Sequence, residues 1–145
     1  MANVAATVAG LRADRINFLR TLYFEGVFAK PVSEAVKTAA WQIALQASPG
    51  ADASRGALAH IDQREAMAGL ACPALVFVGD ADGVVPAGIG EFAAATLQNA
   101  TLVNMAGCGH APFLEDPAAY LSAMDEFLAD VGALCGPDVV FQPRH

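Results

Sequence analysis

The spacing of apolar residues divides the chain near Ala71 into a helical first part and a second part in which strands alternate with helices. Apolar side chains at intervals of three and four residues indicate amphipathic helices in the first part. Pro31 is expected in the first turn of the second of these helices, and the Ser-Pro-Gly sequence at residues 48–50 is expected to end it. Two short helices, over residues 54–60 and 63–70, are expected to follow. The periodic positions are Ile16, Leu19, Leu22 and Tyr23, then Val32, Val36, Ala39, Ala40 and Ile43.

Strand-like and helical patterns alternate after Ala71. Residues 74–78 form a continuous apolar run between Pro73 and Gly79, which is typical of a strand buried on both faces. A helix over residues 88–98 and a second strand over residues 101–105 are expected next. A strand, a crossover helix of this length and another strand form a βαβ unit, which predicts parallel strands and a right-handed connection.

A final helix is expected to begin at Asp116 and Pro117, with the aspartate as its cap and the proline in its first turn. The sequence thus predicts an α/β fold with a helical region over residues 1–70, an α/β region over residues 71–134 and an irregular tail over residues 135–145. The expected buried stripe of the last helix comprises Tyr120, Leu121, Met124, Phe127, Leu128 and Val131.

Two parallel strands leave both edges of a sheet open, whereas parallel pairs normally lie inside larger covered sheets. We therefore expect either a homo-oligomer or pairing with a missing N-terminal half. The 145 residues suit one domain, and 55% hydrophobic against 16% charged residues excludes disorder.

Charge is distributed unevenly along the chain, with a net value of -7. Residues 65–143 hold ten acidic residues and neither lysine nor arginine, so nucleic acid and anionic membranes are not expected as partners. Without an apolar run long enough to span a bilayer or a basic leader, the protein is expected to be soluble and cytoplasmic. Its three cysteines, Cys72, Cys108 and Cys135, lack metal-like spacing and are expected to be small buried thiols.

Candidate chemistry lies where the two predicted strands end, because ligands of open α/β sheets bind beyond the carboxyl ends of the strands. Asp82 follows the first strand and His110 follows the second, so the two side chains are expected to meet. An aspartate bonded to one imidazole nitrogen leaves the other free to exchange a proton, which is the base half of a hydrolytic triad. Asp80 is a competing acid in the same loop. As alternatives, Asp82 is a turn residue and His110 a buried structural histidine.

The segments at residues 73–86 and 107–117 resemble the last third of α/β-hydrolases of the esterase, lactonase and cofactor-free haloperoxidase type. The similarity extends from about His60 to Val131. It implies that Asp82 is the triad acid and His110 the triad base, acting on a small apolar ester-like substrate without metal or cofactor. The helical region, with the Asp-Arg pair at residues 14–15 and its aromatic side chains, is similar to the lid of that family and implies an apolar acyl pocket.

The family's nucleophile motif, G-x-S-x-G between a strand and a helix, is not found in the sequence. Ser54 comes nearest, but Asp52 stands in the place of the first glycine. We therefore predict a C-terminal fragment that lacks the serine and is inactive when isolated. The alternative is a non-catalytic remnant or interaction module that binds a partner through its exposed sheet edge. Glu115 and Asp116 are expected to be helix-entry residues, not catalytic acids.

Overall fold

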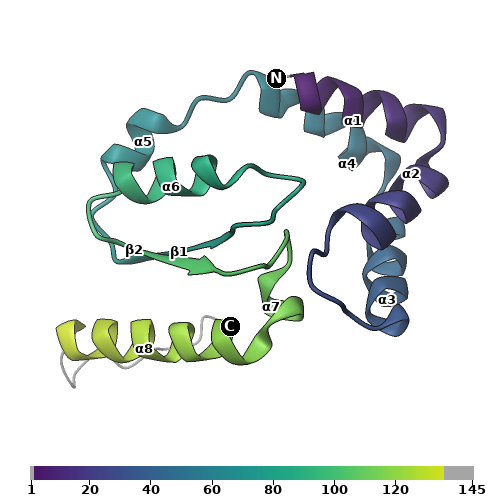
Figure 1. Cartoon of the computed structure of the whole chain (residues 1–145). Helices are drawn as coiled ribbons and strands as arrows, with labels where there is room; N and C mark the ends of the chain where they lie inside the picture. The colour runs from purple at the N-terminus through teal and green to yellow at the C-terminus, as the bar shows by residue number, and fades with distance from the viewer. Residues whose placement is uncertain (1, 136–145) are drawn as a thin grey trace, which may run out of the picture.

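The computed structural model describes residues 2–135 and begins with a group of helices (Figure 1). All of these helices precede the sheet; those from α1 to η2 pack together, whereas α5 lies beside α6. They are α1 (Ala2–Ala13), α2 (Arg15–Thr21), the π-helical turn η1 (Leu22–Gly26), α3 (Glu34–Leu45), α4 (Pro49–Ser54), the 3₁₀ turn η2 (Arg55–Ala59) and α5 (Arg64–Ala68).

The second part of the chain is a βαβ unit followed by two helices. Strands β1 (Ala74–Gly79) and β2 (Ala100–Met105) pair in parallel, in register from Ala74 with Ala100 to Gly79 with Met105. Helix α6 (Ala87–Thr96) connects them, and α7 (Pro112–Glu115) leads into α8 (Pro117–Cys135). Figure 1 shows α6 and α8 on opposite sides of the sheet. The parallel βαβ arrangement predicted from the sequence is confirmed.

Helix α8 begins as predicted, because the Asp116 carboxylate accepts a hydrogen bond from the Ala119 amide (3.3 Å) and Pro117 is its first residue. The helix includes Cys135, and the remainder of the predicted irregular tail lies outside the described residues.

Helix α3 begins later than the sequence pattern predicts. Ser33 is its N-cap, with an extended backbone and a hydroxyl that accepts a hydrogen bond from the Val36 amide (3.3 Å). Pro31 lies two residues before this cap, so its predicted first-turn position is wrong. The expected stop at residues 48–50 is correct for α3, which ends at Leu45, and Ser48 in turn caps α4.

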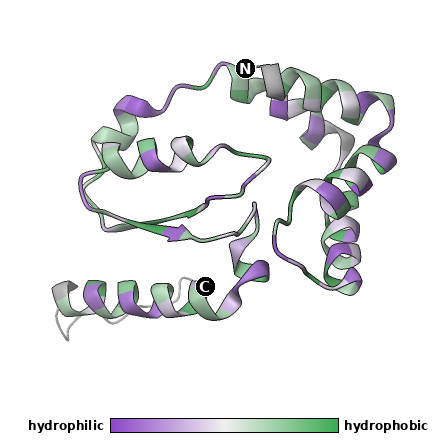
Figure 2. Cartoon of the chain, viewed as in Figure 1, coloured by the Kyte–Doolittle hydropathy of each residue, from purple (hydrophilic) through white to green (hydrophobic). Residues whose placement is uncertain are grey.

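The apolar surfaces of the βαβ unit are covered less completely than predicted. Leu121 and Leu128 of α8 are 57% and 55% exposed, and the buried residues of β1 are Val78 and Gly79 alone. Two strands present too narrow a surface to cover a whole helical stripe. Figure 2 shows apolar stretches along both strands and on α6 and α8. Among the helices of residues 2–135, none combines the length and the apolarity needed to cross a bilayer.

The N-terminal helices are held together by the guanidinium of Arg15. Its Nε forms an ion pair with the carboxylate of Asp52, which is 8% exposed. Its terminal nitrogens donate to the carbonyls of Ala44 (3.1 Å), Leu45 (3.2 Å) and Ala47 (2.7 Å), which lie at and just beyond the end of α3. A single side chain of α2 thus donates to carbonyl groups at a helix end, where intrahelical partners run out, and joins them to α4.

Replacing Arg15 by alanine is expected to lower the free energy of unfolding by about 3 kcal/mol, because Asp52 would remain buried without its cation. Urea unfolding followed by the fluorescence of Trp41, the single tryptophan of the chain, measures this loss. The exposed Arg12 provides the control, and Arg12→Ala is expected to change stability by no more than about 0.5 kcal/mol. Equal unfolding midpoints for the two variants would contradict the role given to Arg15.

Candidate active site

The loops that follow β1 and β2 lie against each other, because the two parallel strands end in register at the same edge of the sheet. The Ala81 amide donates to the carbonyl of Cys108 (3.0 Å), and the Gly107 amide donates to the carboxylate of Asp80 (2.6 Å). The loop over residues 80–86 and the loop over residues 106–111 therefore form one hydrogen-bonded unit.

Two glycines permit this close approach. A Cβ atom on Gly79 would lie 2.2 Å from the carbonyl oxygen of Gly109, and one on Gly109 would lie 2.6 Å from that of Val27. The loop that carries His110 is thus enclosed between the end of β1 and residues 27–30, the segment between η1 and α3. In addition, the His110 amide donates to the Val27 carbonyl (2.8 Å).

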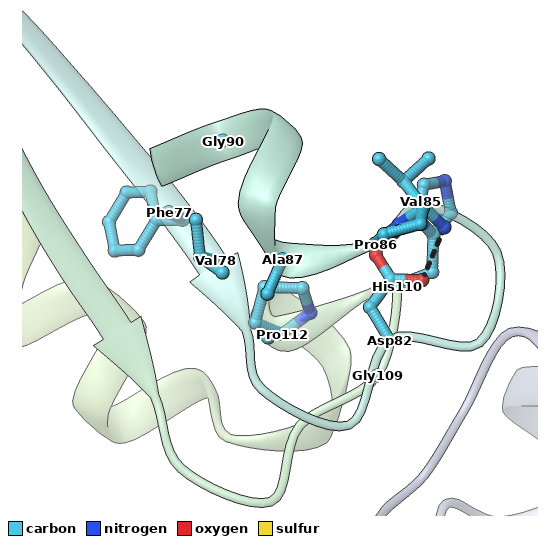
Figure 3. Close-up of a pocket in the computed structure, with 11 residues that line it drawn as sticks. Phe77, Val78, Asp82, Val85, Pro86, Ala87, Gly90, Gly109, His110 and Pro112 are labelled. Atoms are coloured by element: carbon cyan, nitrogen blue, oxygen red, sulfur yellow. Dashed lines mark hydrogen bonds and ion pairs between the residues drawn. The ribbon is translucent and has the colours of Figure 1, made fainter. Parts of the chain in front are cut away.

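Asp82 and His110 meet at this edge of the sheet (Figure 3). The Asp82 Oδ2 atom lies 2.9 Å from His110 Nδ1, while its Oδ1 atom accepts from the amides of Val84 (2.7 Å) and Val85 (2.9 Å). The aspartate side chain is 11% exposed and the histidine side chain 42%. Engagement of Nδ1 by the carboxylate leaves Nε2 as the nitrogen that can exchange a proton with a reactant.

The surroundings of Asp82 favour its charged form. Burial is the largest single influence and would raise the pKa of the carboxyl, but hydrogen bonds from the Val85 amide, the His110 imidazole and the Val84 amide together outweigh it. The pKa of Asp82 is therefore below its usual value, and the group is a carboxylate at neutral pH.

The structure brings Asp82, and not Asp80, to the histidine. The carboxylate of Asp80 instead accepts the Gly107 amide and holds the two loops together. Asp82 also closes the turn through Val84 and Val85, so a turn role and a histidine contact coexist in one side chain. That Asp82 is the triad acid and His110 the triad base remains a prediction.

A cavity of about 190 Å³ opens beside this pair. Its walls come from the end of β1, the start of α6 and the histidine loop, and they are mainly apolar. The lining residues are Phe77, Val78, Gly79, Asp82, Val85, Pro86, Ala87, Gly90, Gly109, His110 and Pro112.

None of the chain's four serines lines this cavity. Ser33 and Ser48 cap helices, and the Ser122 hydroxyl donates to Glu126 within α8. Ser54 lies in α4, where its hydroxyl donates to the Ala51 carbonyl (2.7 Å). The geometry therefore assembles an acid and a base without a serine hydroxyl from these residues.

Glu115 is the feature of this site that sequence reasoning missed. The sequence predicted only a helix-entry role for it. In the structure, Glu115 is 9% exposed and its carboxylate accepts hydrogen bonds from four backbone amides. Two of those donors, Ala29 and Lys30, are more than 80 positions away in the sequence, so no local signal could have revealed the arrangement.

Among the cysteines, Cys108 is fully buried, as predicted, whereas Cys72 is exposed, so that expectation was wrong there. The Cys135 side chain lies outside what the structure describes. Within residues 2–135, no group of three or more His, Cys, Asp or Glu side chains is arranged to hold a metal ion.

Stability is expected to decline in acid because of Glu115 and Asp82. Burial raises the pKa of Glu115, but hydrogen bonds from Gly109, Lys30, Ala29 and Ala111 outweigh it, so both carboxyls have pKa values below their ordinary 4.5 and 3.8. The folded state therefore binds fewer protons than the unfolded state in this range. The free energy of unfolding should be constant above about pH 6 and fall as the pH drops through 4.5 toward the folded-state values.

Urea unfolding between pH 3 and pH 7 tests this expectation. The free energy of unfolding should depend less steeply on pH in Glu115→Gln, because this variant lacks one of the two titrating groups. A wild-type stability that rises on acidification would refute the prediction.

Comparison with known proteins supports this fold. Residues 2–123 match the sequence profile described as "Alpha/beta hydrolase family". The chain therefore belongs to the α/β-hydrolase family, which confirms the predicted resemblance and the partial α/β-hydrolase fold.

Curated relatives similar to the chain are esterases. The pimeloyl-[acyl-carrier protein] methyl ester esterase of Chromobacterium violaceum is 34% identical over 73 residues, which are 50% of this chain and 29% of that protein. The enzyme of the same name from Xanthomonas campestris pv. campestris (strain B100) is 39% identical over 74 residues, or 51% of this chain and 29% of that protein.

Solved structures similar to the chain include the bromoperoxidase of Bacillus anthracis, with a TM-score of 0.80, 27% identity and coverage of 88% of this chain and 48% of that one. The esterase EaEST of Exiguobacterium antarcticum has a TM-score of 0.80 at 23% identity, covering 87% and 47%, which supports the fold alone. The chain thus spans about half the length of these solved relatives.

Proposed function

We propose that this chain supplies the acid and the base of an ester-hydrolysing Ser-His-Asp enzyme, whose serine comes from outside these 145 residues. The observation that carries the proposal is the 2.9 Å contact between Asp82 Oδ2 and His110 Nδ1 at the edge of an apolar cavity. Family membership and the esterase relatives support the same reaction class.

In the proposed mechanism, Asp82 accepts a hydrogen bond from the Nδ1–H group of His110 and so fixes the tautomer in which Nε2 is unprotonated. Nε2 takes the proton of the serine hydroxyl as its oxygen attacks the ester carbonyl, and then gives that proton to the departing alkoxide. Water, deprotonated in turn by Nε2, attacks the resulting acyl-enzyme and releases the carboxylic acid and the serine. The Val84 and Val85 amides hold Asp82 in place as a carboxylate throughout.

The proposed substrate is a small ester with an apolar acyl or alkyl group. Phe77, Val78, Ala87 and Pro112 provide apolar walls to a cavity of about 190 Å³, which suits a short chain and not a bulky one. The similar curated relatives are named as methyl ester esterases, which is consistent with a small alcohol portion.

A second candidate is a non-catalytic module that binds a partner through a sheet edge. Within the described residues, β1 and β2 pair only with each other, so each has an unpaired edge. Unpaired edges can accept another strand. A G-x-S-x-G segment encoded directly upstream of the chain would favour the hydrolase, and its absence there would favour the binding module.

The hydrolase proposal can be tested in a chimera. The N-terminal part of the Chromobacterium violaceum esterase, up to the position that corresponds to Ala2 of this chain, is fused in front of this chain, and hydrolysis of a short-chain p-nitrophenyl ester is measured. We expect hydrolysis by the chimera, almost none by the isolated chain, and a loss of at least about a thousandfold in kcat with His110→Ala.

The exposed His60 provides the matched control, since His60→Ala removes an imidazole that does not line the cavity beside His110. A folded chimera whose activity survives His110→Ala would overturn the proposal. Hydrolysis by the isolated chain that disappears in Ser54→Ala would show that the nucleophile lies within these residues.

A further inference from the structure

The buried carboxylate of Glu115 takes no part in the proposed proton transfers, yet it lies directly behind the histidine loop. Its Oε1 atom accepts from the amides of Gly109 (2.9 Å) and Ala111 (3.2 Å). Its Oε2 atom accepts from the amides of Ala29 (2.8 Å), Lys30 (2.7 Å) and, as a shared contact, Gly109 (2.9 Å). The negative charge is therefore stabilised by hydrogen bonds from main-chain donors of two separate segments.

The donors on the site side flank His110. Gly109 and Ala111 are its neighbours on each side, and both are bound to the carboxylate. The amide of His110 itself points to the other segment, where it donates to the Val27 carbonyl (2.8 Å). Three successive amides are thus fixed, and the histidine side chain leaves the backbone at the middle one.

The donors on the other side belong to residues 27–30, between η1 and α3. The Glu115 carboxylate consequently joins the N-terminal helical region to the loop that presents His110. Lys30 contributes its amide to Glu115 but directs its ammonium to Asp116 (2.7 Å), so the cation is bound by a neighbouring carboxylate.

Four donors require a carboxylate and not merely a polar group. A glutamine at this position would offer one acceptor oxygen, and its NH₂ group would face amide N–H groups that also donate. Buried amides left without an acceptor lower the free energy of unfolding. A glutamine would therefore not hold both segments.

We propose that Glu115 is a positioning residue for His110: it clamps the histidine loop to residues 27–30 and thereby keeps the imidazole in contact with Asp82. The catalytic meaning of this clamp rests on the proposed hydrolase function, but the clamp itself is a property of the isolated chain. The clamp predicts that the orientation of the His110 imidazole depends on the position of the N-terminal helical region.

The test compares the wild type with Glu115→Gln and the matched control Asp116→Asn by NMR of the full chain. Both variants remove one negative charge at adjacent positions, but Asp116 contacts Lys30 and the start of α8, not the histidine loop. We expect Glu115→Gln to speed amide hydrogen exchange at Gly109, His110 and Ala111 by about tenfold or more, while β1 amides keep their protection.

The imidazole ¹⁵N signals of His110 provide the readout that a purely structural role would not move. The wild type and Asp116→Asn should show a single tautomer with the proton on Nδ1, whereas Glu115→Gln should show averaging between tautomers. Unchanged imidazole signals in a folded Glu115→Gln protein would overturn the proposal.

Hydrogen exchange in the wild type keeps the proposal testable even if the variant does not fold. The amides of Ala29, Lys30, Gly109 and Ala111 should open together, with equal protection and equal temperature dependence. If the amides of Ala29 and Lys30 exchanged independently of those of Gly109 and Ala111, the clamp proposal would be overturned. Because these measurements need no activity, an inactive chimera with an intact clamp would refute the hydrolase proposal alone, and the reverse result would refute the clamp alone.

Discussion

Asp82→Asn is expected to lower the kcat of the chimeric esterase by about four orders of magnitude, with little change in KM. The asparagine oxygen can still accept from the Val84 and Val85 amides, so the turn is preserved. Its NH₂ group, however, then faces His110 Nδ1 and donates to it. The imidazole is forced into the tautomer that carries its proton on Nε2, where it cannot accept the serine proton.

Asp80→Asn is the matched control for this prediction, because Asp80 lies in the same loop as Asp82 but its carboxylate is bound to the Gly107 amide and not to His110. Its oxygen accepts the Gly107 amide, a bond that asparagine can keep. We expect kcat within a few-fold of the wild type. Steady-state kinetics of both variants on one ester measure these changes. A large loss of kcat with Asp80→Asn but not with Asp82→Asn would assign the role of triad acid to Asp80.

Gly79→Ala is expected to destabilise the protein by about 3 kcal/mol, a large effect for a single methyl group. The new Cβ would lie 2.2 Å from the Gly109 carbonyl oxygen and 2.5 Å from that of Cys108. Both are main-chain atoms of an enclosed loop, so no side-chain rotation relieves the clash. The end of β1 and the histidine loop must separate, which also breaks the contact between Asp82 and His110.

Gly88→Ala serves as the control, since it adds the same methyl group in α6, where nothing lies within 4 Å of the new atom. That change is expected to stabilise the protein by about 0.5–1 kcal/mol through the higher helix propensity of alanine. Urea unfolding of both variants measures the difference. A Gly79→Ala midpoint equal to that of the wild type would show that the two loops are not in close contact.

The parts of the fold predicted correctly from sequence are those encoded by neighbouring residues. The apolar run ended by Gly79 predicted β1, and Asp116 followed by Pro117 predicted the start of α8. Because strand ends in a parallel pair coincide, these local patterns were enough to predict that Asp82 and His110 would meet.

Errors and omissions arose where distant residues or weak patterns decide the structure. Helix α1 is rich in alanine and lacks a distinct apolar face, so no periodic signal marks it. Pro31 predicts a helix start from its local sequence, but Ser33 is the N-cap of α3 and its hydroxyl accepts a hydrogen bond from the Val36 amide. The role of Glu115 depends on amides of residues 29 and 30, which only the tertiary fold brings near.

The contacts that align Asp82 with His110 all lie between Val27 and Glu115, within this one stretch of chain. An α/β-hydrolase divided upstream of such a stretch would lose its nucleophile from the same polypeptide but keep its proton-relay geometry assembled. That property is what a protein-complementation reporter requires: a silent fragment, already folded, whose signal depends only on docking of the other piece.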